Sequence, residues 1–372
     1  MKDFKSLLLG AAVAALLILP AAAAEDWVTW PQKSFSGSAL RVDDFVGTLV
    51  VNVSNGGPVR VDVSGTRERV NQVDVHASGS TIYIEGSNTD TVWDWHSWFN
   101  FDYGKSKPDQ LVVKVSLPRG SAVSVDDMVG KATIGDTMGP LKFEASATQS
   151  KIGKVTSAKI SLDGTGRIDL AAVSGPLDLD IAGSGKVNVG PTQSVKADIA
   201  GAGDTALGPI AGGLSVDIAG SGDISASRVN GPVKVDIAGS GSVNIADGIA
   251  NPLHVDIMGS GNFTFGGLAI DPKVSSFGSG SVKIKAYKGH MSSDGMASVD
   301  VGAEVSAAAV RAQAQAEAAA ARATAAGERA AAHATAEAAR AAARANAEAA
   351  KAAARAQARH SDDNDDDDDG HR

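Results

Sequence analysis

Apolar and polar residues alternate along residues 159–284, and a pair of glycines interrupts the alternation at nearly constant intervals. One copy reads VDIAGSGDI at 216–224, and the next reads VDIAGSGSV at 235–243. Alternation with a period of two predicts a half-buried strand on each side of a tight turn. The first glycines of the pairs, 18 to 20 residues apart, are Gly164, Gly183, Gly201, Gly220, Gly239, Gly259 and Gly278. Self-similarity at this period predicts a stacked repeat architecture.

Four positions in each repeat are almost always aliphatic. They lie four and two residues before the first glycine of the pair, and four and six residues after it. In that order the four columns are Ile160, Leu179, Ala197, Val216, Val235, Val255, Val274; Leu162, Ile181, Ile199, Ile218, Ile237, Ile257, Ser276; Ile168, Val187, Thr205, Ile224, Val243, Phe263, Val282; and Leu170, Val189, Leu207, Ala226, Ile245, Phe265, Ile284. If equivalent residues stack on rungs about 4.8 Å apart, the columns form one continuous core. We therefore predict an all-β parallel solenoid.

The residues before the repeats are also rich in strand patterns, but less regular. Residues 49–53, 59–63, 81–84 and 111–118 read as strands separated by Gly, Asn, Ser and Pro. Because terminal repeats of a stacked array are usually atypical, we expect these residues to form irregular early coils that cap and start the solenoid.

The strand pattern followed by Gly-Ser-Gly repeats resembles a known family. An early strand pair, the short strand 82–84 and the strand ending Val115-Ser116-Leu117-Pro118 precede the repeats. Together they resemble the GIN domain, described as a putative auto-transporter adhesin head, over roughly residues 38–285. The resemblance implies a secreted, right-handed, β-helix-like domain of bacteria, and it supplies no catalytic residues.

The first residues have the features of a secretory signal peptide. Lys2 and Lys5 precede an apolar run at 7–18, and small residues at 22–24 suit a cleavage site. The apolar run is too short to argue for a membrane span. We therefore predict an exported protein, located in the periplasm or at the cell surface, without a transmembrane span.

Alanine dominates from residue 303 onward, and this composition favours a helix. Cationic residues recur every 11 positions, at Arg311, Arg322, His333, Arg344 and Arg355, which keeps one helix face in register. The helix is either a solvated single helix or a stalk that oligomerises as a weak coiled coil. The aspartate-rich end is expected to be a disordered, solvating tail. The predicted divisions are a signal peptide (1–24), a lead-in (25–37), the GIN-like solenoid (38–286), a linker (287–302), the alanine-rich helix (303–360) and the acidic tail (361–372).

Composition excludes several classes of function. The chain contains no cysteine, so it has neither disulfides nor thiolate metal sites. Its formal net charge is −9, and nucleic-acid binding needs a basic face. We predict no nucleic-acid partner and no cofactor.

An aspartate recurs three residues before the first glycine of five repeats, at Asp180, Asp198, Asp217, Asp236 and Asp256. Stacked carboxylates suggest a ladder of cation sites. However, Lys159, Lys196, Lys234, His254 and Lys273 stand two residues earlier on the same outward face in their repeats. Diagonal pairs between neighbouring strands could neutralise the aspartates, so we favour a charge-compensated ladder and predict no metal site.

A hydroxyl residue follows the first glycine in most repeats, at Thr165, Ser184, Ser221, Ser240, Ser260 and Ser279. A serine nucleophile needs a histidine and an orienting acid. Near-equivalent serines without a dedicated histidine suit turns instead. No catalytic residues are therefore predicted, and we expect the protein not to be an enzyme.

The stretch 93–103 departs most from the repeat pattern. Its aromatic residues are the candidate ligand-binding residues: Trp93, Trp95, Trp98, Phe99, Phe101 and Tyr103. One interpretation is an aromatic plug at one end of the solenoid. The other is an exposed platform for a glycan, lipid headgroups or a protein, because aromatic residues are enriched at binding surfaces.

These patterns predict a non-enzymatic binding or adhesion module of the bacterial cell envelope, with a glycan or another envelope component as its partner. The alternative is a structural envelope protein whose helix and tail mediate assembly. A polysaccharide-active enzyme is a more distant third, because fold does not determine function.

Overall fold

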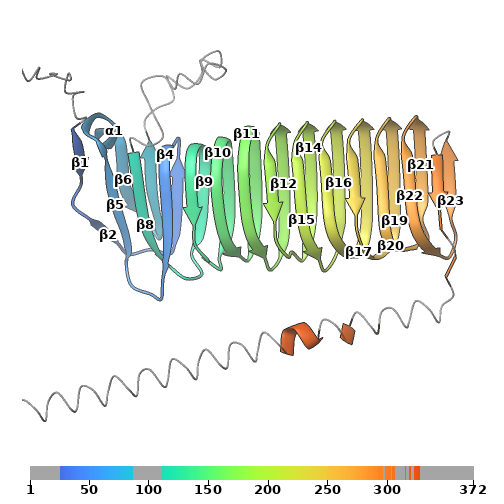
Figure 1. The fold of residues 1–372 in the computed structure, drawn as a ribbon. Coiled ribbons are helices and arrows are strands. Elements are labelled where there is room, and N and C mark those ends of the chain that lie inside the picture. The colour runs from blue at the N-terminus through green and yellow to red at the C-terminus, as the bar shows by residue number, and fades with distance from the viewer. Residues whose placement is uncertain are drawn as a thin grey trace, which may run out of the picture. The chain divides into compact units, whose positions relative to one another are not determined.

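The computed structural model describes residues 26–86, 111–295, 298–302, 304–305, 315, 318–319 and 322–326. The chain forms two compact units, residues 1–304 and residues 305–372. The first unit is built of strands, which lie side by side in a long row in Figure 1. In the second unit, the described residues 315, 318–319 and 322–326 are helical. The predicted signal peptide, most of the predicted helix and the acidic tail lie outside the described residues.

The N-terminal part of the first unit contains β1 (Trp27–Thr29), β2 (Lys33–Phe35), β3 (Ala39–Asp43), β4 (Val46–Ser54), β5 (Val59–Thr66), α1 (Arg67–Asn71), β6 (Val73–Ser78), β7 (Thr81–Gly86) and β8 (Leu111–Pro118). The remaining strands are β9 (Ala122–Ile134), β10 (Pro140–Val155), β11 (Ser157–Val173), β12 (Pro176–Gly183), β13 (Lys186–Val189), β14 (Ser194–Gly201), β15 (Asp204–Ile210), β16 (Leu214–Gly220), β17 (Asp223–Gly239), β18 (Ser242–Ile245), β19 (Gly248–Gly259), β20 (Asn262–Ile270), β21 (Lys273–Gly278), β22 (Ser281–Lys288), β23 (Ser292–Gly295) and β24 (Ser298–Val301).

From β9 onward the named strands pair in parallel, one repeat apart. Successive glycines of the Gly-x-Gly turns are register partners, as Gly201 is of Gly220 and Gly220 of Gly239. Backbone hydrogen bonds continue through the turns, since the amide of Ser240 donates to the carbonyl of Gly220 at 2.8 Å. The predicted all-β solenoid with rungs of about 19 residues is therefore confirmed. Its right-handedness stays a prediction.

The four predicted columns form the core. Every residue in them is buried, and none is more than 5% exposed. The structure adds two buried columns that the sequence analysis missed, six residues before and nine residues after the first glycine. They include Leu177, Val195, Leu214, Val233 and Leu253 in one, and Val173, Ile210, Val229 and Leu268 in the other. They were missed because the second turn of each repeat, often containing proline, interrupts the alternation.

The N-terminal part caps the solenoid, but its order differs from the predicted series of coils. β3 pairs in parallel with both β7 and β9, and β4 with both β8 and β9. The β3–β4 rung therefore lies between β7–β8 and β9. β5 runs antiparallel to β8, and β6 runs antiparallel to β7. The expectation of irregular coils at residues 59–63 is wrong, because β5 is an antiparallel strand that ends the parallel stacking.

The C-terminal part of the ladder extends beyond residue 286. Residues 287–302, expected as a linker, include β23 and β24, which pair in parallel with β21 and β22. Val299 and Val301 are only partly buried against the core. The alternation of Ser298–Val301 continues the repeat pattern without its Gly-x-Gly turn, so the pattern that predicts a rung is weaker here.

A charged network joins the first regular rungs on their outer face. Asp126 on β9 is 8% exposed. Its carboxylate lies 2.7 Å from Lys142 Nζ on β10 and 3.2 Å from Arg41 Nη2 on β3. Burial alone would raise the pKa of Asp126, but the hydrogen bond and charge of Lys142, together with the charge of Arg41, lower it. The carboxylate is therefore held ionised at neutral pH.

Replacing Asp126 with Asn is expected to lower the free energy of unfolding by about 2 kcal/mol at pH 7. The folded-state pKa lies below the unfolded value of about 3.9. The stabilisation is therefore present above that pH and lost as pH falls through the folded pKa. Urea unfolding at pH 7 and pH 3 measures the difference, with exposed Asp256→Asn as the control. An equal loss of unfolding free energy in Asp126→Asn at both pH values would contradict the conclusion that the ionised Asp126 carboxylate stabilises the fold.

Candidate binding surface

The aspartate column lies on the outer face of β12, β14, β16, β17 and β19, and its members are register neighbours. Lys196 pairs with Asp198, and Lys234 pairs with Asp236. In each pair the two residues lie on the same strand, two positions apart. These two pairs therefore differ from the predicted diagonal pairing between neighbouring strands. Side chains at i and i+2 share a face of a strand, which explains the contact. Lysine thus compensates the negative charge of the aspartate column in alternate rungs, at Asp198 and Asp236.

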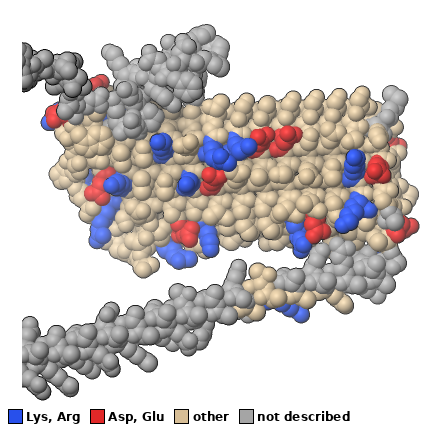
Figure 2. Space-filling view, in the orientation of Figure 1, with Lys and Arg blue, Asp and Glu red and all other residues tan. Residues whose placement is uncertain are grey.

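Asp180 shows the opposing effect of stacked carboxylates. Burial raises its pKa, and the negative charge of Asp198 on the next rung raises it further, while Lys159 and Lys196 lower it. Among the described residues, no three His, Asp or Glu side chains are grouped so that they could hold a metal ion. Figure 2 shows Lys and Arg interspersed with Asp and Glu on the visible face of the first unit. The outer face is therefore a mixed-charge surface.

We expect the melting temperature to be nearly the same with a chelator and with millimolar calcium. A lysine already pairs with the carboxylate at Asp198 and at Asp236. A site that bound calcium only in the folded state would stabilise that state by about 2.7 kcal/mol at one hundred times its dissociation constant. Differential scanning calorimetry tests this expectation, and a calcium-dependent rise of many degrees would contradict it.

The serine column lies in the turns at one edge of the solenoid, here called the turn edge. Ser184, Ser221 and Ser240 are exposed, and their amides donate to glycine carbonyls of the preceding rung at 2.8 to 2.9 Å. These backbone bonds extend the ladder across the turn. The column thus has a structural role in the stacking of the turns.

The predicted aromatic residues, Trp93, Trp95, Trp98, Phe99, Phe101 and Tyr103, all lie outside the described residues. The described ends of their segment are Gly86, where β7 ends, and Leu111, where β8 begins. Glu85 is the register partner of Asp43, and Val112 that of Thr48. In the neighbouring β3–β4 rung, the chain turns between Asp43 and Thr48 at Asp44, which has φ +51°. The described ends Gly86 and Leu111 therefore lie at the turn edge.

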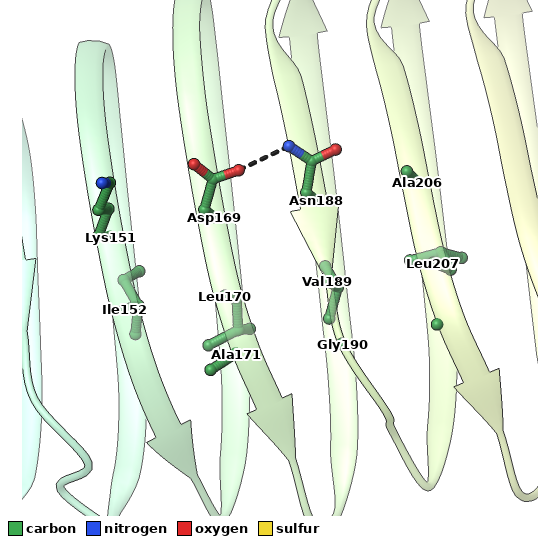
Figure 3. Close-up of a pocket in the computed structure, with 11 residues that line it drawn as sticks. Lys151, Ile152, Asp169, Leu170, Ala171, Asn188, Val189, Gly190, Ala206 and Leu207 are labelled. Carbon is green, nitrogen blue, oxygen red and sulfur yellow. Dashed lines mark hydrogen bonds between the residues drawn. The ribbon is translucent and has the colours of Figure 1, made fainter.

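A groove of about 490 Å³ opens on the face formed by β10, β11, β13 and β15. Its floor is the strand backbone that overlies the buried side chains of Ile152, Leu170, Val189 and Leu207, which belong to one core column and its extension into β10. Figure 3 shows these side chains in a row across four neighbouring strands. The groove is open to solvent along its length. The exposed apolar side chains of this groove are those of Ala171 and Ala206.

Small residues beside the floor create the groove. The residues that follow the floor side chains are Gly153, Ala171, Gly190 and Gly208. A Cβ on Gly190 would lie 1.8 Å from the carbonyl oxygen of Ala171. The backbones approach so closely that only glycine fits there, and no side chain is left to cover the floor.

Polar side chains form one rim of the groove. Lys151, Asp169 and Asn188 are successive register partners, one rung apart. The amide Nδ2 of Asn188 donates to Oδ1 of Asp169 at 2.6 Å, as Figure 3 shows. Arg167 Nε lies 3.4 Å from the same oxygen. The repeat pattern does not distinguish these residues, because they occupy ordinary outward positions of the alternation. The available signal was the run of Gly and Ala two residues later.

The structure thus defines a parallel β-solenoid with a lateral groove. A family model described as "Putative auto-transporter adhesin, head GIN domain" matches residues 210–287. The resemblance inferred from the sequence is confirmed over these residues. They begin just after the groove-lining residues, of which Gly208 is the last in the chain.

Similar solved structures include a putative adhesin from Bacteroides fragilis NCTC 9343, with 14% identity, a TM-score of 0.45, and coverage of 59% of this chain and 97% of that chain. A putative adhesin from Parabacteroides distasonis ATCC 8503 has 16% identity, a TM-score of 0.37, and coverage of 76% and 98%. A putative lipid binding protein from the same organism has 16% identity, a TM-score of 0.35, and coverage of 76% and 97%. No curated protein matches the chain. Among the described residues, no helix is long and apolar enough to cross a membrane.

Proposed function

We propose that this protein is an exported, non-enzymatic binding module of the bacterial cell envelope, with an adhesin-like role. The observation that carries the proposal is the lateral groove, which combines the exposed side chains of Ala171 and Ala206 with polar groups on a rigid scaffold. Ligand sites commonly pair an apolar surface with a few placed polar groups. The matched family description supports adhesion, and the signal-like residues 1–24 support export.

The aromatic segment is proposed as a second contact with the same partner. The segment that contains it follows Gly86 and precedes Leu111, and both of these residues lie at the turn edge. The β7–β8 rung lies two rungs before β9, because β3–β4 is interposed. Rung spacing is about 4.8 Å, so the two ends of the segment lie at a short distance from the groove along the solenoid. Tryptophan side chains commonly dominate binding energy at interfaces.

Sedimentation of the mature protein with isolated envelopes of the bacterium that produces it tests the proposal. The wild type is expected to sediment with the envelopes. A variant with Trp93, Trp95 and Trp98 all changed to Ser should bind at least about tenfold more weakly. Trp27→Ser is the matched control, because Trp27 is an exposed tryptophan, 52% accessible, on β1. Its binding should be unchanged.

Two results would count against the proposal. A wild-type protein that stays in the supernatant with every envelope fraction is not a binding module. If instead the wild type and the triple variant bind equally, and truncation after residue 302 abolishes binding, the helix and tail mediate assembly. That outcome would favour the alternative of a structural envelope protein. Circular dichroism establishes that each variant is folded before binding is compared.

A further inference from the structure

We propose that two copies of this chain associate side by side through an apolar stripe that runs along the solenoid from Ala182 to Phe277. Met258 on β19 and Phe277 on β21 are 65% and 58% exposed. They are register partners on neighbouring rungs, so their side chains stand next to each other on the outer face. Among the described residues, the only other exposed large hydrophobic side chain is Trp27 on β1. Adjacent large apolar side chains in water mark a surface for a partner.

The stripe continues from Met258 as a column of small apolar side chains. Each of its members directly precedes the first glycine of its repeat, as Met258 and Phe277 do. The small members are register partners from rung to rung and are all exposed: Ala182, Ala200, Ala219 and Ala238. The stripe is therefore uncharged for roughly 25 Å, at about 4.8 Å per rung. It ends at Asp163, the register partner of Ala182.

The columns on the two sides of the stripe have complementary hydrogen-bonding chemistry. The aspartate column lies two residues before the stripe in each rung, and the serine column of the turn edge lies two residues after it. Asp256 and Ser260 flank Met258 in this way, and Asp217 and Ser221 occupy the same positions two rungs earlier; all are exposed. A carboxylate only accepts hydrogen bonds, whereas a hydroxyl can donate one. A surface with acceptors on one side of an apolar stripe and donors on the other can pair with itself.

The same arrangement selects the symmetry of the pair. In an isologous contact, both copies use the same patch, and a two-fold axis relates them. If the axis runs along the stripe, the solenoids lie parallel, the two Phe277 side chains meet, and each aspartate column faces the serine column of the other copy. If the axis crosses the stripe instead, the two aspartate columns face each other and their like charges repel. Charge therefore favours the parallel pair.

The contact is small, which predicts a weak dimer. The stripe and its two flanking columns cover roughly 450 Å² on each copy, taking about 4.8 Å per rung and about 3.3 Å per residue along a strand. Specific complexes commonly bury about 800 Å² per partner. We therefore expect a dissociation constant on the order of 10 μM rather than a nanomolar one.

Sedimentation equilibrium of the mature protein, at concentrations that bracket about 10 μM, measures the association. A variant that combines Met258→Ser with Phe277→Ser should raise the dissociation constant at least about tenfold. Trp27→Ser is the matched control, because it removes an exposed tryptophan outside the stripe, and it should leave the constant unchanged. A wild type that stays monomeric throughout, or a double variant that dimerises like the wild type, would overturn the proposal.

Crosslinking through introduced thiols tests the symmetry of the pair. The chain contains no cysteine, so Ala182→Cys and Ala238→Cys each supply a single thiol, three rungs apart on the stripe. In the parallel pair each thiol faces its own counterpart. A thiol-specific crosslinker that spans about 10 Å, the usual distance between packed sheets, should therefore convert both variants into covalent dimers.

An antiparallel pair could crosslink through one of these positions but not through both, because only residues at the crossing point meet themselves. Ala246→Cys is the control: Ala246 is exposed and follows β18, in the other ladder of the solenoid, and it should not crosslink. Dimers from only one stripe variant, from neither, or equally from Ala246→Cys would overturn the proposed contact.

Discussion

Replacing Ile237 with Asp is expected to unfold the rungs around it and to lower the melting temperature by tens of degrees or prevent folding. Ile237 is 2% exposed and lies in register between Ile218 and Ile257, which are also buried. An unpaired carboxylate in this column must either stay charged in an apolar core or take up a proton, and each alternative costs several kcal/mol. Each rung stacks only on its neighbours, so damage to one rung exposes the cores of two others.

Thermal melting followed by circular dichroism measures this loss, with two controls. Asp236→Ile changes the adjacent outward residue and should alter stability little, because surface substitutions usually have small effects. Ile237→Val should cost about 0.5–1.5 kcal/mol, the usual range for this change in a core. A melting temperature for Ile237→Asp within a few degrees of the wild type would contradict the assigned register.

Replacing Gly239 with Ala is expected to destabilise the solenoid by more than about 3 kcal/mol, because two penalties combine. Its φ is +135°, a conformation that side chains rarely adopt. In addition, a Cβ at this position would lie 2.2 Å from the carbonyl oxygen of Gly220, its register partner on the preceding rung. Removing that clash would separate the two rungs and break the ladder through the turn.

Gly57→Ala separates the two penalties. Gly57 also has a positive φ, +94°, but no atom lies within 4 Å of where its Cβ would be. Only the backbone penalty applies to Gly57→Ala, and it should lower the free energy of unfolding by about 1–2 kcal/mol. Urea unfolding of both variants gives the comparison. Equal losses of unfolding free energy in Gly57→Ala and Gly239→Ala would show that the close stacking of the turns contributes nothing to stability.

The repeat core could be predicted because its information is local and repeated. Ile218, Ile237 and Ile257 occupy one position of a pattern that recurs at a fixed interval, so the register follows from counting. The N-terminal cap could not be predicted in the same way. Val59–Val63 alternates like any other strand, and alternation does not reveal whether a strand runs parallel or antiparallel. Insertion of the β3–β4 rung between β7–β8 and β9 depends on contacts between residues distant in sequence.

The groove illustrates a second limit of the pattern. Lys151 and Asn188 are outward polar residues, as Lys283 and Asn244 are in other rungs. What distinguishes their surroundings is the close approach of the Gly190 and Ala171 backbones, which leaves the floor uncovered. A glycine in a strand pattern is compatible with a turn, a bulge or a close approach, and only the folded chain shows which applies. The aromatic residues at 93–103 were distinctive in sequence, and their role stays a prediction.

Acetylation of lysines in the mature protein, with and without isolated envelope polysaccharide, tests most directly whether the partner occupies the lateral groove. Lys151 lies on the rim, and Lys283 occupies the same repeat position in a later rung, where it is also exposed. Mass spectrometry gives the two rates within a single sample, so Lys283 is an internal control. We predict that bound polysaccharide slows modification of Lys151 several-fold and leaves Lys283 unchanged. Equal rates at Lys151 with and without bound polysaccharide would contradict the assignment of the groove.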